Sequence, residues 1–314
     1  RVCAEVLLAH VIGCERMRLY MEVDRPASTE ELERLRGLVA RGARHEPIQY
    51  LVGHAWFFTH RFAVDESTLI PRPSTETLVE RIIAHCRPAP AEPDMTMASG
   101  DDGSLEAPGP HGEDTGSPVA VAHDTVRPAP AHGTPGSAPS APLRLLDIGT
   151  GTGCIAISAA RALGHLSVVA VDIEPRAIDL ASRNAIDLGV AGRIDFRTGD
   201  LFSSLDESDR GTFDVIASNP PYISDAEWSD VAPNVRDFEP ERALRGGADG
   251  LDVIRRLLRE APQWLRSGGL LAIEIAASLG NAAQALASAQ PELFDVQIAR
   301  DHEGLDRVLL ARRR

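Results

Sequence analysis

The residues best suited to chemistry are Asn219-Pro220-Pro221-Tyr222, directly after an apolar run at 213–218 that is typical of a buried parallel strand. A planar amide or aniline-like NH2 group is a poor nucleophile, because its lone pair is delocalised. The Asn219 side-chain oxygen and the Pro220 carbonyl could accept hydrogen bonds from its two N–H groups as the nitrogen becomes positive. The Tyr222 ring offers a flat face to such a group. Alone, this tetrapeptide also fits a simple turn; in context, it predicts methylation of a planar nitrogen.

A second candidate site is the glycine loop 149–153, which lies between an expected strand and an expected helix. Glycines at such a junction let a cofactor approach unpaired backbone N–H groups. A dinucleotide site requires Gly or Ala at the sixth position, where this chain has Cys154, so a ligand without a pyrophosphate is favoured. The residues that we assign to cofactor binding here are Gly149, Thr150, Gly151, Thr152 and Gly153.

Residues at strand ends complete the expected cofactor site. Asp172 ends the next strand, 23 residues after Gly149, and we expect it to accept both ribose hydroxyls. Asp147 is expected to contact the methionine end through the loop and ordered water, and Asp200 and Leu201 to flank the adenine. With Asn219 also assigned to the cofactor, the order of these strand ends predicts an S-adenosylmethionine-dependent methyltransferase.

Alternating elements are expected to position these residues. Helices are predicted near 153–164, 175–189, 250–266 and 278–289, and strands at 143–148, 167–172, 193–197, 213–218 and 269–275. This alternation implies a mostly parallel sheet with helices on both faces. The loop between 294–300 and 307–310 is too short for a parallel crossover, so these strands must pair antiparallel. The prediction is an α/β, Rossmann-like seven-stranded class I methyltransferase sheet with an antiparallel C-terminal strand.

The N-terminal part has a different pattern. Residues 1–46 show helical spacing, with Ser28 and Glu31 as a capping pair, and predict a small helical domain. Because the chain opens at Arg1 inside a helical pattern, we expect further residues to precede it.

Aromatic and β-branched residues then predict a β-hairpin linker over 47–72. Ser74 is expected to cap a helix that runs through Cys86, with Glu76 in its first turn. The methyltransferase domain is accordingly predicted over 73–314.

Residues 88–142 form an insert of unusual composition within that domain. This stretch holds 11 of the 22 prolines, seven glycines and no aromatic residue. It cannot bury enough apolar surface to offset the entropy of ordering, so we predict disorder. The insert carries eight acidic residues against Arg127, which is −7 of the formal net charge of −14. The remaining 259 residues therefore also carry −7, which disfavours direct nucleic-acid binding.

The 314 residues include no apolar run near 18 residues and no secretion signal, so neither membrane association nor export is expected. The four cysteines have neither pairing nor metal-ligand spacing, which indicates reduced thiols, a cytoplasmic location and no metal site.

Further segments resemble one family, the release-factor glutamine methyltransferases, also called PrmC or HemK. The resemblance is most specific in the linker and covers nearly all of the chain outside 88–142. Its matching stretches are Glu46-Pro47-Ile48-Gln49-Tyr50-Leu51-Val52-Gly53, Trp56-Phe57, Phe62-Ala63-Val64, Leu69-Ile70-Pro71-Arg72-Pro73, Glu239-Pro240, Ala243-Leu244, Gly246-Gly247, Asp249-Gly250-Leu251, Glu274-Ile275 and Asp306-Arg307-Val308. The chain departs from the family pattern at Ser74, usually acidic, at Ala276, usually glycine, and at Leu279, often glutamine.

The resemblance implies methyl transfer from S-adenosylmethionine to the side-chain nitrogen (N5) of the glutamine in the Gly-Gly-Gln motif of peptide chain release factors. It also implies that residues 1–46 dock this protein substrate, and we expect a monomer. We assign catalysis to Asn219, Pro220 and Tyr222, and substrate binding to Asn219, Pro220, Pro221, Tyr222, Arg72 and Phe57.

The alternative is methylation of an exocyclic amine of adenine or guanine in nucleic acid, since Asn-Pro-Pro-Tyr also occurs in such enzymes. That activity predicts a basic groove beside Asn219. The loop after it instead carries Asp225, Glu227, Asp230, Asp237 and Glu239.

The composition of the insert yields a prediction. Replacing 88–142 by about six Gly/Ser residues should keep methyl transfer within a few-fold, because loop-closure cost grows only with the logarithm of length. Limited proteolysis of the intact chain should cut first inside this stretch. A shortened chain that binds cofactor normally but cannot methylate a release factor would show instead that the insert binds a partner.

Overall fold

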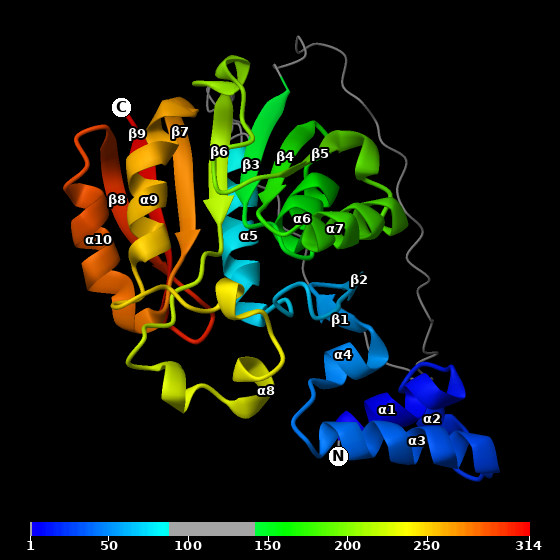
Figure 1. Cartoon of the computed structure of the whole chain (residues 1–314). Helices are drawn as coiled ribbons and strands as arrows, with labels where there is room; N and C mark the ends of the chain where they lie inside the picture. Colours follow the sequence, from blue (N-terminus) through cyan, green and yellow to red (C-terminus); the bar gives the residue numbers. More distant parts are fainter. Residues whose placement is uncertain (1, 88–141) are drawn as a thin grey trace, which may run out of the picture. The chain divides into compact units, whose positions relative to one another are not determined.

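The computed structural model describes residues 2–87 and 142–314, which belong to one compact unit (Figure 1). Of the predicted insert, 88–141 lies outside the described residues. No helix in the described part of the chain combines the length and the apolar character needed to cross a membrane.

A seven-stranded sheet forms the centre of this unit. Its strands are β3 (Leu143–Ile148), β4 (Leu166–Asp172), β5 (Ile194–Thr198), β6 (Phe213–Ser218), β7 (Leu265–Glu274), β8 (Leu293–Arg300) and β9 (Asp306–Arg313). They lie in the order β5-β4-β3-β6-β7-β9-β8. The first five pair in parallel, whereas β9 pairs antiparallel with both of its neighbours. This confirms the predicted class I methyltransferase sheet and its antiparallel C-terminal strand.

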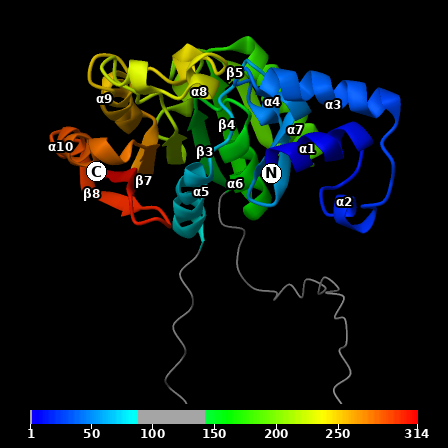
Figure 2. The ribbon, with the colours of Figure 1, turned by 90° about the horizontal axis from the view of Figure 1, so that it is seen from below.

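Helices cover both faces of the sheet. They are α5 (Pro73–Cys86), α6 (Cys154–Ala162), α7 (Pro175–Asp187), α9 (Asp252–Glu260) and α10 (Gly280–Ser288). Side chains of α5, α6 and α7 form one apolar core with the sheet, and those of α9 and α10 form the other. Figure 2 shows α5 and α6 on one side of the strands and α9 on the opposite side. Burial on both faces explains why β6, in which every residue is buried, is a nearly continuous apolar run.

One helix boundary differs from the sequence-based expectation. The helix predicted over 250–266 ends at Glu260, and a 3₁₀ turn over Ala261–Gln263 follows. Pro262 lacks the N–H that would continue the helical hydrogen bonds, and its ring disfavours helical geometry before it. As a result β7 begins at Leu265, earlier than the predicted 269.

The N-terminal segment is helical, as expected. It contains α1 (Val2–Ile12), α2 (Arg18–Met21) and α3 (Thr29–Gly42), and Leu7 of α1 packs with Leu35 and Leu38 of α3. The Ser28 hydroxyl accepts the Glu31 N–H at 3.1 Å, and the Glu31 carboxylate accepts the Ser28 N–H at 2.8 Å. The predicted capping pair is confirmed.

The linker holds a helix that the sequence reasoning missed. α4 (Ile48–Val52) precedes the expected hairpin, which is limited to β1 (His54–Phe57) and β2 (His60–Ala63). Leu51 and Val52 complete the small apolar core of the N-terminal helices, which explains why this segment is helical and not extended.

Ser74 does not cap α5, contrary to our expectation. The helix begins at Pro73, and Arg72 occupies the cap position without a side-chain hydrogen bond. Proline suits the first helical position because its φ is already helical and it has no N–H to satisfy. The Ser74 hydroxyl donates instead to Oε1 of Glu274 at 3.2 Å.

Asn184 of α7 joins the hairpin to the glycine loop. Its Oδ1 accepts the Ala63 N–H at 2.8 Å, and its Nδ2 donates to the carbonyls of Ala63 at 3.1 Å and Thr152 at 2.9 Å. The side chain is 1% exposed, so water cannot replace these partners.

Asn184→Ala should therefore destabilise the protein by about 2–4 kcal/mol, since it removes the partner of the part-buried Ala63 backbone and of the buried Thr152 carbonyl. Urea denaturation measures this change. Asp187→Asn, at an exposed position of the same helix, is the matched control and should change the unfolding free energy by less than about 0.5 kcal/mol. An equal effect of the two variants would contradict the bridging role.

Candidate active site

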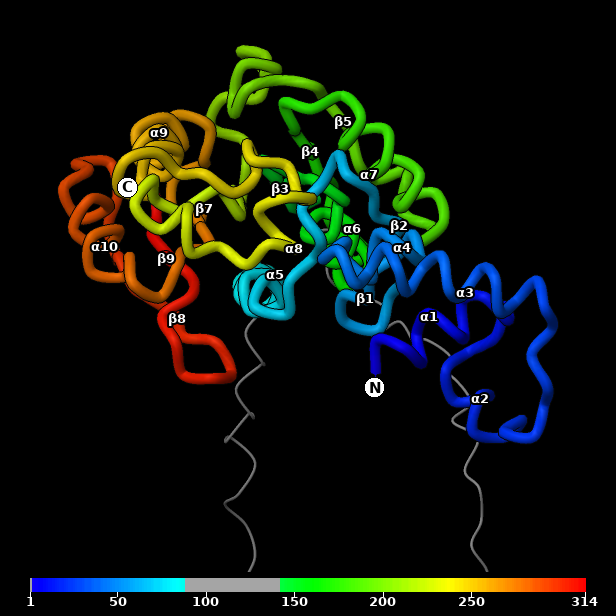
Figure 3. The backbone as a smooth tube through the Cα atoms, turned by 60° about the horizontal axis from the view of Figure 1, so that its bottom comes forward, coloured from blue at the N-terminus to red at the C-terminus, as the bar shows by residue number. Residues whose placement is uncertain are grey.

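A cavity of about 600 Å³ opens at the carboxyl edge of the parallel strands. Figure 3 looks toward that edge, with the segment of α8 (Pro233–Arg236) and the stretch before α5 in front of the sheet. Many of the predicted site residues line the cavity: Arg72, Gly149, Thr150, Gly151, Thr152, Asp172, Asp200, Leu201, Asn219, Pro220 and Pro221. In the described residues, no group of three His, Cys, Asp or Glu side chains could hold a metal ion.

The glycine loop forms one wall of this cavity. The backbone N–H groups of Gly149 and Thr150 both donate to the Val171 carbonyl, which holds the loop against the end of β4. Gly153 has a φ of +81°, and a Cβ there would come within 2.8 Å of the Ile157 side chain. This position therefore requires glycine, so that the loop can turn directly into α6.

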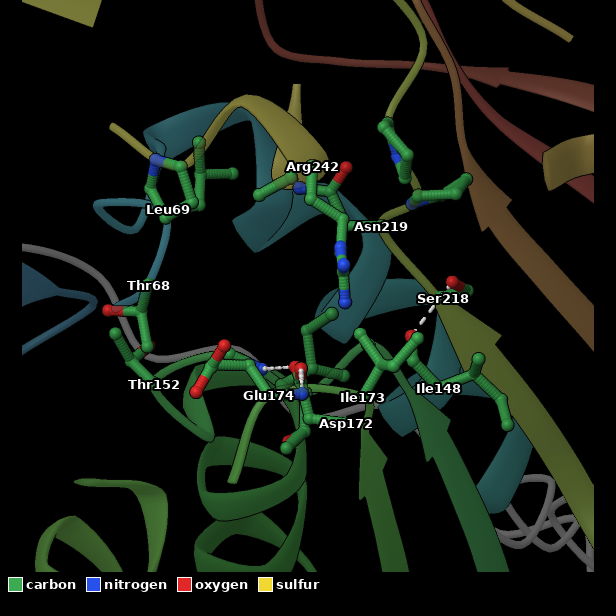
Figure 4. Close-up of a pocket in the computed structure, with 18 of the residues that line it drawn as sticks. Thr68, Leu69, Ile148, Thr152, Asp172, Ile173, Glu174, Ser218, Asn219 and Arg242 are labelled. Atoms are coloured by element: carbon green, nitrogen blue, oxygen red, sulfur yellow. Dashed lines mark hydrogen bonds between the residues drawn. The ribbon is translucent and has the colours of Figure 1, made fainter. Parts of the chain in front are cut away.

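Asp172 lies at the end of β4 and binds the loop. Its Oδ2 accepts the Gly151 N–H at 2.8 Å, and its Oδ1 accepts the Glu174 N–H at 3.0 Å (Figure 4). Burial raises the pKa of this carboxyl above its ordinary value, against the effect of these hydrogen bonds. Each oxygen keeps a further lone pair for a ligand hydroxyl.

Asp147 lies beneath the loop, fully buried, and is not among the residues that line the cavity. Its Oδ2 accepts hydrogen bonds from the Thr150 hydroxyl at 2.7 Å and the Ala156 N–H at 3.1 Å. Its Oδ1 is buried without a partner in the described part of the chain. Burial raises the pKa of Asp147 to about 7, although both donors favour the ionised form.

Asn219 follows the last residue of β6, where the Ser218 hydroxyl donates to the Ile148 carbonyl at 2.8 Å and joins β6 to β3. The Nδ2 of Asn219 donates to the Thr75 hydroxyl oxygen of α5 at 3.2 Å. That contact leaves Oδ1 as the end of the amide that can accept a hydrogen bond from a ligand. Pro220 and Pro221 line the same cavity.

Tyr222 lies at a smaller adjoining cavity of about 110 Å³, which Asn219 and Pro220 also line. Burial, followed by the nearby Glu274 carboxyl, raises the pKa of Tyr222 to about 12, so its ring carries a neutral hydroxyl. Two cavities thus meet at Asn219 and Pro220, one beside the glycine loop and one beside the tyrosine ring.

Gly246 and Gly250 pack directly against the backbone of Pro221 and Tyr222, a role that the sequence did not indicate. A Cβ on Gly246 would lie 2.8 Å from the Pro221 carbonyl oxygen, and one on Gly250 would lie 2.4 Å from that of Tyr222. Only glycine permits this approach. The available signal was that Gly246-Gly247 and Asp249-Gly250 match the family pattern.

Of two residues predicted to bind substrate, Arg72 lines the cavities and Phe57 does not. Arg72 lines both cavities, and its guanidinium pairs with the buried Glu239 carboxylate, which also accepts the Ile70 N–H at 3.0 Å. Phe57 is 1% exposed and packs edge-on against Phe58 and Phe62. We therefore correct its assignment: Phe57 belongs to the core, because alternation along β1 turns it inward and leaves Trp56 exposed.

Two charged groups lie where the cavity meets solvent. Asp200 lines the cavity and forms an ion pair with Arg256 at 3.0 Å, with both side chains largely exposed. Arg242, which the sequence did not single out, extends its guanidinium into the cavity (Figure 4). The wall near Asn219 therefore includes positive groups from Arg72 and Arg242.

Comparisons with known proteins match both parts of the chain. Residues 1–53 match a family described as the PrmC N-terminal domain, and residues 138–235 match the methyltransferase small domain. The release factor glutamine methyltransferase of Rhodopirellula baltica is 35% identical over 309 residues, or 98% of this chain and 88% of the relative. That of Geobacter sulfurreducens is 36% identical over 310 residues, with the same coverage. A methyltransferase structure from Pyrococcus furiosus has 23% identity and a TM-score of 0.40, over 54% of this chain and 73% of that one.

The buried Asp147 carboxyl makes stability depend on pH. Its pKa is about 7 in the folded protein, against about 3.9 for an unfolded aspartate, so the folded state holds the proton more tightly. Its contribution to stability is complete below the unfolded pKa and is lost as pH rises through about 7. The side chain introduced by Asp147→Asn cannot ionise. As pH rises between the two pKa values, the unfolding free energy of this variant minus that of the unaltered protein should therefore increase by up to about 1.4 kcal/mol per pH unit. Urea unfolding across this pH range measures the difference. Parallel plots of unfolding free energy against pH for the two proteins would contradict the prediction.

Proposed function

The chain belongs to the release factor glutamine methyltransferase family, and we propose that it transfers a methyl group from S-adenosylmethionine to N5 of the glutamine in the Gly-Gly-Gln motif of peptide chain release factors. The observation that carries this proposal is the orientation of Asn219, whose Nδ2 is occupied by Thr75 while its other end is left to accept. The near full-length similarity to named relatives supports the substrate.

The residues of the larger cavity fit a sulfonium nucleoside. Asp172 keeps lone pairs for two ribose hydroxyls, and we assign the adenine to the wall that includes Asp200 and Leu201. The unpartnered Oδ1 of Asp147 is a buried acceptor beneath the loop, which suits a cationic methionine end reached through ordered water. S-adenosylmethionine supplies an activated methyl group when it is bound.

The chain's own groups then prepare the substrate nitrogen. We propose that Oδ1 of Asn219 and the carbonyl of Pro220 each accept one N–H of the glutamine amide, and that Tyr222 packs against its flat face. These acceptors stabilise positive charge on the nitrogen as it pyramidalises. No general base is required, because the methylated nitrogen can release its proton to solvent. Catalysis would thus depend on orientation and acceptor placement.

The smaller cavity offers a route for the glutamine side chain, since it meets the larger one at Asn219 and Pro220. The glycines of the substrate motif lack side chains that would block such a narrow entry. We also assign Pro221, which lines the larger cavity, and Arg72, which lines both cavities, to substrate binding. We propose that residues 1–46 dock the body of the release factor. A substrate of the translation machinery implies a cytoplasmic location; the monomeric state stays a prediction.

Mass spectrometry of a release factor incubated with the protein and labelled S-adenosylmethionine tests this function. The expected product is one added methyl group on the Gly-Gly-Gln glutamine, and none when that glutamine is replaced. A parallel reaction offers nucleic acid that contains adenine and guanine, the substrate of the alternative function. Methylation of the nucleic acid alone would overturn the proposal in favour of an exocyclic-amine methyltransferase.

Asn219→Ala should reduce methyl transfer at least about 100-fold, because one acceptor for developing charge is worth roughly 3 kcal/mol. Cofactor affinity, measured by calorimetry, should fall much less, since Asn219 acts mainly on the amide. Asn234→Ala, at an exposed position of α8, is the matched control and should keep normal turnover. Near-normal turnover by the Asn219 variant would remove this residue from the mechanism.

A further inference from the structure

The amide of Asn219 has two ends of nearly equal shape and opposite hydrogen-bonding character. Oδ1 accepts, whereas Nδ2 only donates. The glutamine NH2 group needs an acceptor, so an Asn219 side chain rotated by half a turn would present a donor to a donor. Whatever binds the other end of Asn219 therefore decides whether the site is competent.

That partner is Thr75, in the first turn of α5, which is 2% exposed and accepts from Nδ2 at 3.2 Å. A hydroxyl has one proton, and accepting from Asn219 leaves that proton for another acceptor. A candidate acceptor is the buried carboxyl of Glu274, at the end of β7, whose pKa the Thr75 hydroxyl lowers.

Burial and a hydrogen bond fix the position of the Glu274 carboxyl. It is 0% exposed, and the Ser74 hydroxyl donates to its Oε1 at 3.2 Å. Its Oε2 has no hydrogen-bond partner in residues 2–87 and 142–314, so it can accept the proton of the Thr75 hydroxyl. The hydroxyls of Ser74 and Thr75 thus both lower the pKa of one buried carboxyl, and that of Thr75 also accepts from the candidate catalytic amide.

We propose that Thr75 and Glu274 are positioning residues, which hold the Asn219 amide with Oδ1 toward the substrate through a directed hydrogen-bond chain from Asn219 to Thr75 to Glu274. This inference rests on the proposed function and adds two residues from helix α5 and strand β7 to it. Neither residue needs to touch the substrate.

The direction of the chain depends on the charge of Glu274. Burial raises its pKa to about 7, while the hydroxyls of Thr75 and Ser74 and the positive Arg307 and Arg72 act in the opposite sense. In addition to burial, the charge of Glu274 in turn raises the pKa of Tyr222 and of Cys154. A protonated Glu274 can donate to Thr75, whose own proton is then free to turn toward Asn219 and favour the rotated amide. Turnover should consequently rise with pH through about 7.

The first test uses three threonine variants at saturating cofactor. Thr75→Val removes the hydroxyl at constant shape and should lower kcat about tenfold, the value of one hydrogen bond, while Thr75→Ser should restore most of it. Thr77→Val is the matched control: Thr77 is equally buried on the same helix, and its hydroxyl is without a partner among the described residues. Equal rates for the two valine variants would overturn the proposal.

A double-mutant cycle separates positioning from general stability. In an Asn219→Ala background, Thr75→Val should cause no further loss of kcat, because the amide that it orients is gone. Additive losses would overturn the proposal. In either outcome the unaltered protein still reports on glutamine methylation, so failure of this inference is distinguishable from failure of the proposed function.

A readout without turnover comes from ¹⁵N-labelled protein free of cofactor. The side-chain NH2 signals that disappear in Asn219→Ala should be protected from solvent exchange in the unaltered protein and in Thr75→Ser, and lose protection in Thr75→Val. Unchanged protection in Thr75→Val would contradict the hydrogen bond.

The pH profile of kcat tests Glu274. Glu274→Gln should lower kcat and remove the rise near pH 7, whereas the titration of Asp147 should affect cofactor affinity instead. An unchanged rise in the glutamine variant would remove Glu274 from the chain, and should that variant fail to fold, the Thr75→Val comparison still decides.

Discussion

Parallel pairing of β3 with β4 and β6 is the constraint on which the site depends. Ile148, the last residue of β3, lies opposite Val171 on one side and Ser218 on the other. The glycine loop, Asp172 and Asn219 therefore leave the sheet side by side at one edge. Because side chains alternate along a strand, a register shift of one residue would turn the polar groups to the other face of the sheet.

Three buried carboxyls around this edge differ in how completely they are satisfied. Glu239 accepts the Ile70 N–H and pairs with Arg72, which joins the linker to the segment that follows α8. Asp147 and Glu274 each retain an oxygen without a partner in the described chain, and each has a pKa of about 7. Poorly satisfied buried acids are costly to stability, so they mark positions where ligand binding or orientation outweighs that cost.

Backbone contacts shape the loop after Asn219 as much as side chains do. Gly246 and Gly250 let a second chain segment pack directly on Pro221 and Tyr222, and Ile223 exchanges hydrogen bonds with the Leu244 carbonyl and the Gly246 N–H. With two prolines already limiting its torsions, this loop has little freedom to move. A rigid carbonyl at Pro220 suits a site that works by placing acceptors, because such acceptors need no reorganisation during the reaction.

The sequence by itself determined which polar residues stand at the carboxyl ends of the parallel strands. Each of these strands is a local apolar run, and Gly149, Asp172 and Asn219 each end such a run or directly follow it. The Ser28 cap is equally local. Only the tertiary structure decided that Phe57 belongs to the core, that Asn184 bridges the hairpin and the loop, and that the Asn219 amide donates to Thr75. The residues of that last contact lie 144 positions apart in the chain. No periodicity or spacing encodes such a contact, because it arises from the packing of α5 against the sheet.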